Sequence, residues 1–179
     1  MKKYKYALTI LALVIFFIFK GCILDDFDTL TQNIPVSKEF TVQGNAPAST
    51  TENFCLSSSQ VIQDYRNKIE EIQLVTATYQ TISVDPANAK GDVTITLKKQ
   101  DGTLLYSYTL ASISPADYIN TPYVLQFTDS QLQLINAYLG TLKDNTCFDA
   151  SVSVSNVTPG GTITLTGNID IAFKMKAKT

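Results

Sequence analysis

The C-terminal segment, residues 162–177, constrains the fold more than any other part of the chain. Its apolar and polar side chains alternate strictly, and only Ala172 departs from the pattern. The positions that share the apolar side are Ile163, Leu165, Gly167, Ile169, Ile171, Phe173, Met175 and Ala177. Alternation over such a length is typical of an antiparallel sheet with one face buried and one face in water. We therefore expect the chain to fold around an antiparallel sheet.

Shorter segments repeat this alternation. Residues 93–97 and 104–110 flank Asp101-Gly102, a dipeptide that favours a tight hairpin turn. Gln73 to Val84 is rich in β-branched residues, and its alternation changes parity twice, which predicts a β-bulge or a bend. The other expected strands are Ser37–Gln43, Tyr123–Phe127 and residues 148–155. The expected loops are residues 44–51, 85–92, 114–122 and 159–161.

Two segments carry a helical pattern. In residues 56–72, Val61, Tyr65, Ile69 and Ile72 recur at the spacing of one helical face. Thr128-Asp129 provides a start signal for a second helix over residues 130–143. The whole pattern predicts a mainly β protein: an antiparallel β-sandwich, Ig-like in general architecture, with two amphipathic α-helices. The order of elements does not match an immunoglobulin domain itself.

Composition excludes several kinds of function. The chain has no His, which removes the Ser-His-Asp and Cys-His catalytic arrangements and the common His metal sites. After Cys22 it keeps 10 basic and 16 acidic residues, a net charge of −6 that disfavours nucleic-acid binding. Asp85, Asp92 and Asp101 lie in expected loops, where turn formation is a simpler role than calcium binding. We expect a protein that is not an enzyme, with no metal and no cofactor.

The N-terminus reads as a signal peptide. Lys2, Lys3 and Lys5 precede a 13-residue apolar stretch, Ala7 to Phe19. As a helix this stretch reaches about 20 Å, which is short of the roughly 30 Å core of a bilayer. Such a length is typical of a signal peptide rather than a membrane span. The apolar stretch is followed by Gly21-Cys22.

This N-terminal segment resembles a bacterial lipoprotein signal peptide. The resemblance implies that the Cys22 thiol receives a diacylglycerol, that the chain is cut before Cys22, and that the new N-terminus is acylated. Phe19 and Lys20 depart from the usual outer positions of the cleavage box, a looseness similar to that of lipoproteins of Bacteroidota. The alternative is a short uncleaved anchor that ends in an ordinary cysteine.

The residues after Cys22 are acidic. Residue 23 is Ile, and residues 24–28 contain three aspartates. The segment looks like the acidic export tag of surface lipoproteins in Bacteroidota, and a solvated acidic tether is the alternative. Asp28-Thr29-Leu30 is similar to the O-glycosylation tripeptide of that phylum, which implies modification of Thr29. The expected organisation is a signal peptide at 1–21, an acidic tether at 22–36 and a single β-sandwich domain at 37–179.

Cys55 and Cys147 are the cysteines that remain. Each has a Phe neighbour, as buried cysteines often do, and an exported domain with two cysteines commonly pairs them. The closed loop spans about 90 residues, and a bridge over that length contributes about 4 kcal/mol in the chain-entropy model. Two buried free thiols are the alternative.

These features favour a non-catalytic module attached by its N-terminal lipid to the outer membrane, on its periplasmic face or at the cell surface. Such a module would act through a protein partner. The loop over residues 114–123 is a candidate binding loop because Tyr118 and Tyr123 stand among Ser, Asn and Pro. The simpler alternative is that both tyrosines fold over the core. The competing function is that of a binder or carrier of a lipid, a sugar or another small ligand.

Overall fold

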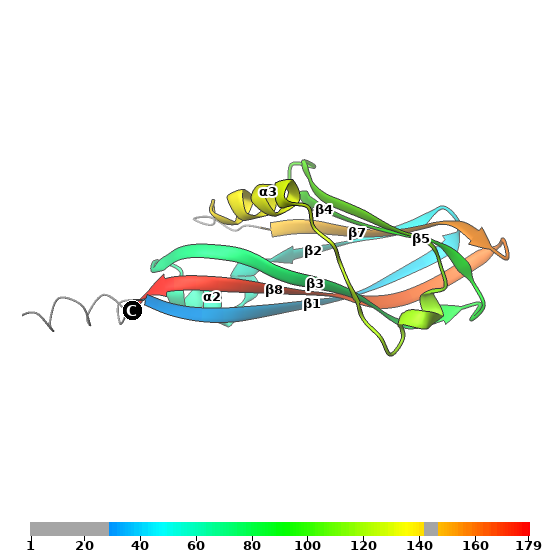
Figure 1. Cartoon of the computed structure of the whole chain (residues 1–179), viewed down its shortest axis with the longest axis horizontal. Coiled ribbons are helices and arrows are strands. Elements are labelled where there is room, and N and C mark those ends of the chain that lie inside the picture. The colour runs from blue at the N-terminus through cyan, green and yellow to red at the C-terminus, as the bar shows by residue number, and fades with distance from the viewer. Residues whose placement is uncertain (1–28, 142–146) are drawn as a thin grey trace, which may run out of the picture.

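The computed structural model describes residues 29–141 and 147–179, which form two packed four-stranded sheets (Figure 1). The strands are β1 (Thr29–Asn45), β2 (Ala48–Cys55), β3 (Ile69–Asp85), β4 (Lys90–Lys99), β5 (Leu104–Ile113), β6 (Tyr123–Val124), β7 (Cys147–Thr158) and β8 (Thr162–Lys178). The helices are η1 (Leu56–Ser58), α2 (Gln60–Tyr65), η2 (Pro115–Tyr118) and α3 (Asp129–Leu139). Among the described residues, none of these helices has both the length and the apolar character that crossing a membrane requires.

The strand order defines a jelly roll. One sheet has the order β1-β8-β3-β6 and the other β2-β7-β4-β5. β1 pairs with β8, β2 with β7, β3 with β6 and β4 with β5, and every pair is antiparallel. These nested pairs are those of one long hairpin wound into two sheets, which is the jelly-roll arrangement. The predicted antiparallel β-sandwich is confirmed, with jelly-roll connectivity in place of the immunoglobulin order.

β8 occupies the interior of its sheet, between β1 and β3. Every position that the alternation assigned to the apolar side is buried, from Ile163 to Ala177. These side chains meet those of the second sheet in a single hydrophobic core. The longest alternating segment is therefore the central strand of the sheet β1-β8-β3-β6, which we call the larger sheet because its three long strands have 17 residues each.

One expected helix is confirmed and the other is largely wrong. α3 begins with a capping box, in which the Gln131 N–H donates to the Thr128 hydroxyl (3.2 Å) and the Thr128 N–H donates to the Gln131 side chain (2.9 Å). The helix expected over residues 56–72 is reduced to η1 and α2, and Ile69 and Ile72 belong to β3. β3 has a register shift between Ile69 and Glu71, so Ile69 and Ile72 both face the core although they are three positions apart. A spacing of three is also that of one helical face, which explains the wrong prediction.

The structure also tests the predicted bulges of β3 and the predicted starts of the first strands. β3 has register shifts at 74/76 and 81/83, which confirms the two predicted breaks of parity. The expected loop at residues 44–51 shrinks to Ala46 and Pro47 because β2 begins at Ala48. β1 begins at Thr29 rather than at the expected Ser37, so residues 29–36 belong to the domain and not to the tether.

The strands place the chain connections at two opposite ends of the molecule (Figure 1). Thr29 pairs with Lys178, and we call the end where they lie the tether end. At the opposite end, which we call the distal end, Asn45 pairs with Thr162 and Lys90 with Thr158. The connections at the distal end are residues 46–47, 86–89, 114–122 and 159–161.

Candidate functional site

The predicted aromatic loop folds against the edge of the sandwich. The Tyr118 ring meets Tyr79 and Tyr123 edge-on, with ring centroids 6.0 and 5.9 Å apart. The Tyr123 hydroxyl shares a 2.7 Å hydrogen bond with the Tyr108 hydroxyl. Both loop tyrosines are half-buried and pack on the core. The structure thus brings the two predicted residues together, in the position expected of side chains that cover the core.

These tyrosines belong to a longer row of aromatic rings. Tyr108 stacks on Tyr106 at 6.3 Å, and Tyr106 packs against Phe127 at 4.4 Å. Tyr79 is fully buried, and its hydroxyl shares a 2.8 Å hydrogen bond with Thr81. Burial raises the pKa of Tyr79 to about 12, against a smaller opposing effect of the Thr81 hydrogen bond. Burial also raises the pKa of Tyr106.

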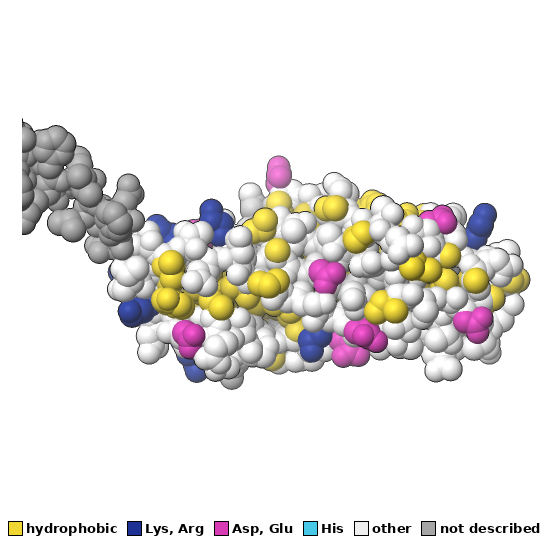
Figure 2. All heavy atoms as spheres, turned by 90° about the horizontal axis from the view of Figure 1, so that it is seen from below, with side chains coloured by type: hydrophobic (Ala, Val, Ile, Leu, Met, Phe, Trp, Pro, Cys, Tyr) yellow, Lys and Arg dark blue, Asp and Glu magenta, His cyan; other side chains and the backbone are white. Residues whose placement is uncertain are grey.

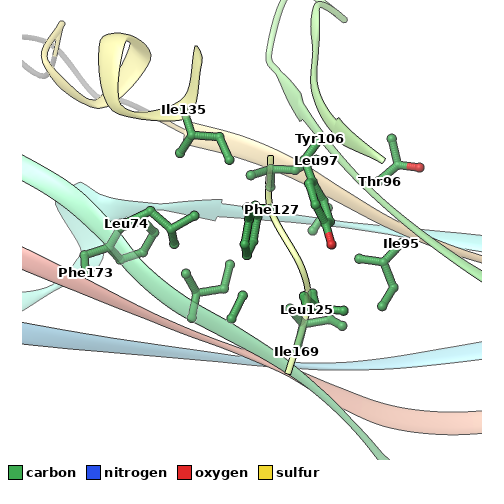
Figure 3. Close-up of a pocket in the computed structure, with 13 residues that line it drawn as sticks. Leu74, Ile95, Thr96, Leu97, Tyr106, Leu125, Phe127, Ile135, Ile169 and Phe173 are labelled. Atoms are coloured by element: carbon green, nitrogen blue, oxygen red, sulfur yellow. The ribbon is translucent and has the colours of Figure 1, made fainter. Parts of the chain in front are cut away.

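A small apolar cavity lies behind Phe127, between the two sheets (Figure 3). Leu74 and Phe173 line it from one sheet, and Ile95 and Tyr106 from the other. Its volume is about 20 Å³, which is enough for one water molecule. A carrier of a lipid or sugar needs a pocket of a few hundred Å³, so a cavity of this volume does not favour that function.

The Tyr106 hydroxyl is an isolated polar group in this core. It is buried and has no hydrogen-bond partner among the described residues. Figure 3 shows its oxygen surrounded by apolar side chains. A buried hydroxyl without a partner loses its hydration and gains nothing in return.

We predict that Tyr106→Phe stabilises the fold by about 1–2 kcal/mol, because it removes a buried hydroxyl that has no partner. Urea unfolding at neutral pH measures this free energy. The matched control is Tyr79→Phe, which leaves the Thr81 hydroxyl without its partner and should cost about 1 kcal/mol. Equal losses for the two variants would show that the Tyr106 hydroxyl has a partner after all.

The fold should also lose stability at alkaline pH. Burial raises the folded-state pKa of Tyr79 to about 12, above the ordinary tyrosine value of about 10. The unfolded chain therefore releases this proton first, so the contribution is complete below about pH 10 and is lost as pH rises to about 12. Two pH units correspond to about 2–3 kcal/mol. Melting temperatures between pH 9 and 12 should fall steeply, and Tyr79→Phe should flatten the curve.

Cys55 and Cys147 form a disulfide, which confirms the predicted pair. They are register partners at the ends of β2 and β7, and the adjacent Phe54 and Phe148 rings stack at 5.1 Å. The bridge ties the edge strand β2 to the rest of its sheet. The alternative of two free thiols is excluded.

Two of the aspartates considered for calcium form structural hydrogen bonds, Asp92 from within β4 to residues of β5 and β7, and Asp101 within its own turn. The Asp92 carboxylate accepts hydrogen bonds from the Ser112 N–H and the Asn156 side-chain amide, both at 2.7 Å, and these bonds lower its pKa. Asp101 accepts from the Thr103 N–H at 2.8 Å. Within residues 29–141 and 147–179, no three His, Cys, Asp or Glu side chains converge as a metal site would require.

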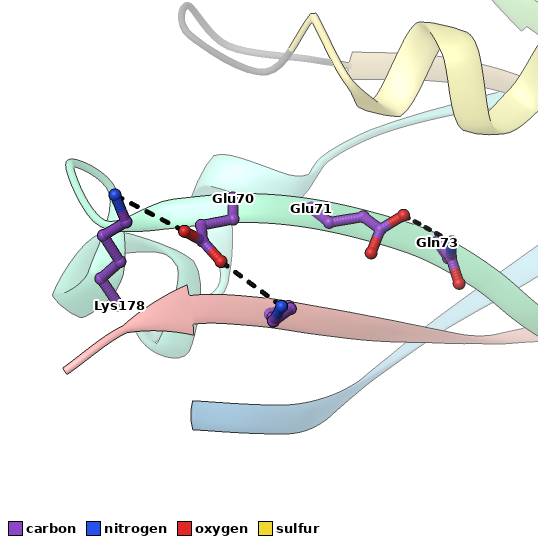
Figure 4. Close-up of polar contacts among 5 residues, drawn as sticks. Glu70, Glu71, Gln73 and Lys178 are labelled. Carbon is purple, nitrogen blue, oxygen red and sulfur yellow. Dashed lines mark hydrogen bonds and ion pairs between the residues drawn. The ribbon is translucent and has the colours of Figure 1, made fainter. Parts of the chain in front are cut away.

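The tether end carries the ion pairs of the described domain (Figure 4). Glu70 lies 3.7 Å from the Lys176 ammonium and 3.6 Å from that of Lys178. Thr29, the predicted glycosylation residue, is half-buried as the first residue of β1. Cys22, the predicted lipidation residue, lies outside the described residues. Sequence reasoning missed the basic character of this end, although Lys174, Lys176 and Lys178 occupy alternate positions of the last strand.

Comparisons with known proteins add little to this description. No protein-family model and no curated protein matches the chain. Among solved structures, one of Desmodium yellow mottle tymovirus is 10% identical, with a TM-score of 0.35 over 83% of this chain and 90% of that one. One of turnip yellow mosaic virus is 12% identical, with a TM-score of 0.42 over 84% and 82%. A mud crab tombus-like virus structure is 9% identical, with a TM-score of 0.41 over 84% and 82%.

Proposed function

We propose that this protein is a non-catalytic lipoprotein that is anchored by Cys22 and presents its distal end to a protein partner. The anchoring membrane is the outer membrane, at its periplasmic face or at the cell surface. The observation that carries this proposal is the separation of the two ends. The chain leaves Cys22 and enters the domain at Thr29, which is the residue paired with Lys178 at the tether end.

The dimensions favour a module that projects from the membrane. The seven peptide units from Cys22 to Thr29 reach at most about 25 Å. β1 has 17 residues, and a strand of that length extends roughly 55 Å. The distal end therefore lies far from the anchor, where a partner has free access.

The chemistry of the distal end suits binding to a protein surface. Its connections contain Pro, Ala, Gly, Ser and Asn, with Asp117 as their one charged residue. Ile82 and Ile119 add apolar surface, with exposures of 45% and 36%. The Gln80 amide donates to the Ile119 carbonyl at 2.8 Å, which holds Ile119 beside the distal half of β3. Rigid strands that present such connections are a common basis for recognition.

Lipidation is tested by labelling cells with a fatty-acid probe. The wild-type chain should take up the probe and stay with the membranes, and Cys22→Ala should do neither. Cys55→Ala is the matched control and should keep the label. Labelling that survives Cys22→Ala would refute the anchor.

Partner binding is tested by photocrosslinking in intact cells. A photoreactive residue at Gly160, in the distal end, should form one saturable adduct, and one at Asn67, in the tether end, should not form it. Ile82→Ser with Ile119→Ser should weaken the adduct. Val75→Ser with Leu134→Ser is the control, because these side chains are 59% and 54% exposed on other parts of the domain. Adducts that are equal at both ends would contradict a distal binding surface.

A further inference from the structure

The tether end of the domain has an unusual concentration of positive charge. Five of the nine basic residues in the described chain gather there, and we call this set the basic end. Its members are Arg66, Lys68, Lys174, Lys176 and Lys178. Figure 2 shows most of the basic side chains of that face gathered at the left end of the domain, which is the tether end.

Backbone pairing holds the basic end together. The Lys178 N–H donates to the Lys68 carbonyl at 2.8 Å, which joins the turn after α2 to the end of β8. Lys174 and Lys176 lie opposite Asn33 and Thr31 of β1. The three β8 lysines occupy alternate positions on the solvent face, so their charges are spread over about 14 Å.

The nearby carboxylates neutralise only part of this charge. Glu70 contacts Lys176 and Lys178, while Glu71 and Asp64 accept hydrogen bonds from Gln73 and Gln60. Among the described residues of this end, five cations stand against three side-chain carboxylates, which leaves a positive excess on the folded surface, although the chain after Cys22 is acidic as a whole. Arg66, Lys68 and Lys174 are exposed and take part in neither of the Glu70 ion pairs. They remain available to an external anion.

We infer that the basic end docks on the phosphate head groups of an anionic membrane surface, an inference that rests on the proposed anchor at Cys22. The tether of at most about 25 Å keeps this end close to the lipid. Attraction between lysines and anionic lipids acts within a Debye length of about 8–10 Å. Docking would therefore follow from tethering and would hold the distal end away from the membrane.

The inference is tested with the full chain purified from membranes and reconstituted into vesicles. The chain has no Trp, so Asn67→Trp provides a single fluorescent reporter at the basic end. Gly160→Trp reports on the distal end, where an added Cβ meets no atom within 4 Å. Head-group spin-labelled lipid quenches a reporter that lies at the surface. We expect strong quenching at position 67 in vesicles with phosphatidylglycerol, and weak quenching in phosphatidylcholine alone or in 0.5 M salt (about a 4 Å Debye length).

Matched charge variants identify the residues responsible. Lys68→Gln with Lys174→Gln removes two charges from the basic end and leaves the Glu70 ion pairs intact. It should weaken the docking equilibrium by roughly tenfold to thirtyfold. Lys90→Gln with Lys98→Gln removes the same charge elsewhere and should leave quenching unchanged. Equal effects of the two pairs, equal quenching in both lipids, or quenching at position 160 would overturn the inference.

The anchor and the docking surface fail in different ways. If Cys22 is not lipidated, Cys22→Ala does not change fatty-acid labelling, whatever the quenching shows. If the basic end instead binds an acidic protein, quenching does not depend on lipid charge, while labelling at Cys22 is unaffected. That second outcome would refute membrane docking and leave the anchor standing.

Discussion

Gly167→Ala should destabilise the fold by about 2–4 kcal/mol. Gly167 lies within β8, and an added Cβ would be 2.5 Å from the Gln80 carbonyl oxygen and 2.7 Å from the Phe40 ring. The ring can shift, but the carbonyl belongs to the neighbouring strand β3, so relief requires backbone movement in the centre of the sheet. Overpacking in a dense core typically costs 1–3 kcal/mol and sometimes more. Urea unfolding monitored by circular dichroism measures the loss.

Gly160→Ala is the control for this substitution. An added Cβ at Gly160 has no atom within 4 Å, and this glycine is not in the left-handed region. The change should be neutral or stabilise by a few tenths of a kcal/mol, since it reduces the freedom of the unfolded chain. A similar loss at both positions would mean that β3 and β8 do not approach each other at Gly167 as described.

Removing the disulfide should have the second large effect. Cys55 and Cys147 are separated by 92 positions, and a bridge over such a loop contributes about 4 kcal/mol by restricting the unfolded chain. Cys55→Ala with Cys147→Ala should therefore lower the urea midpoint markedly. Because β2 is an edge strand, its amide protons should lose more protection from hydrogen exchange than those of β8.

Reductant distinguishes this effect from simple loss of packing. The wild-type chain in reductant should approach the stability of the double variant, and the double variant should not respond to reductant. Cys22→Ala should respond as the wild type does. A wild-type chain whose urea midpoint is unchanged after the bridge has been reduced would contradict a stabilising role.

The sequence predicts the parts of the fold in which side-chain pattern and burial agree. β8 and the β4–β5 hairpin follow directly from alternation and a turn signal. The helix over residues 56–72 fails because the bulge beside Ile69 copies the spacing of a helical face. β2 was missed because Ala48, Thr50 and Glu52 occupy its inward positions, so the strand has little apolar alternation. For both the failed helix and the missed strand β2, pairing with strands distant in sequence overrides the local pattern.

Some of the candidate sites could be predicted from the sequence and others could not. The Cys55–Cys147 pair was predictable because the two cysteines after Cys22 offer one pairing. The unpartnered Tyr106 hydroxyl was not, because whether a hydroxyl finds a partner depends on side chains from the opposite sheet. The basic end forms because residues 66–68 lie beside residues 174–178 in the fold. The two segments are far apart in the sequence, so the sequence does not show that their charges gather.

The pairing of β1 with β8 also governs when the domain can form. β1 is the first strand of the domain, and its one partner within the sheets is the last strand. The larger sheet has no centre until residues 162–178 are present, because β8 separates β1 from β3. A chain still emerging from the ribosome therefore cannot close this sheet early. The strand pairs of the sheet join segments that are distant in sequence, which slows folding.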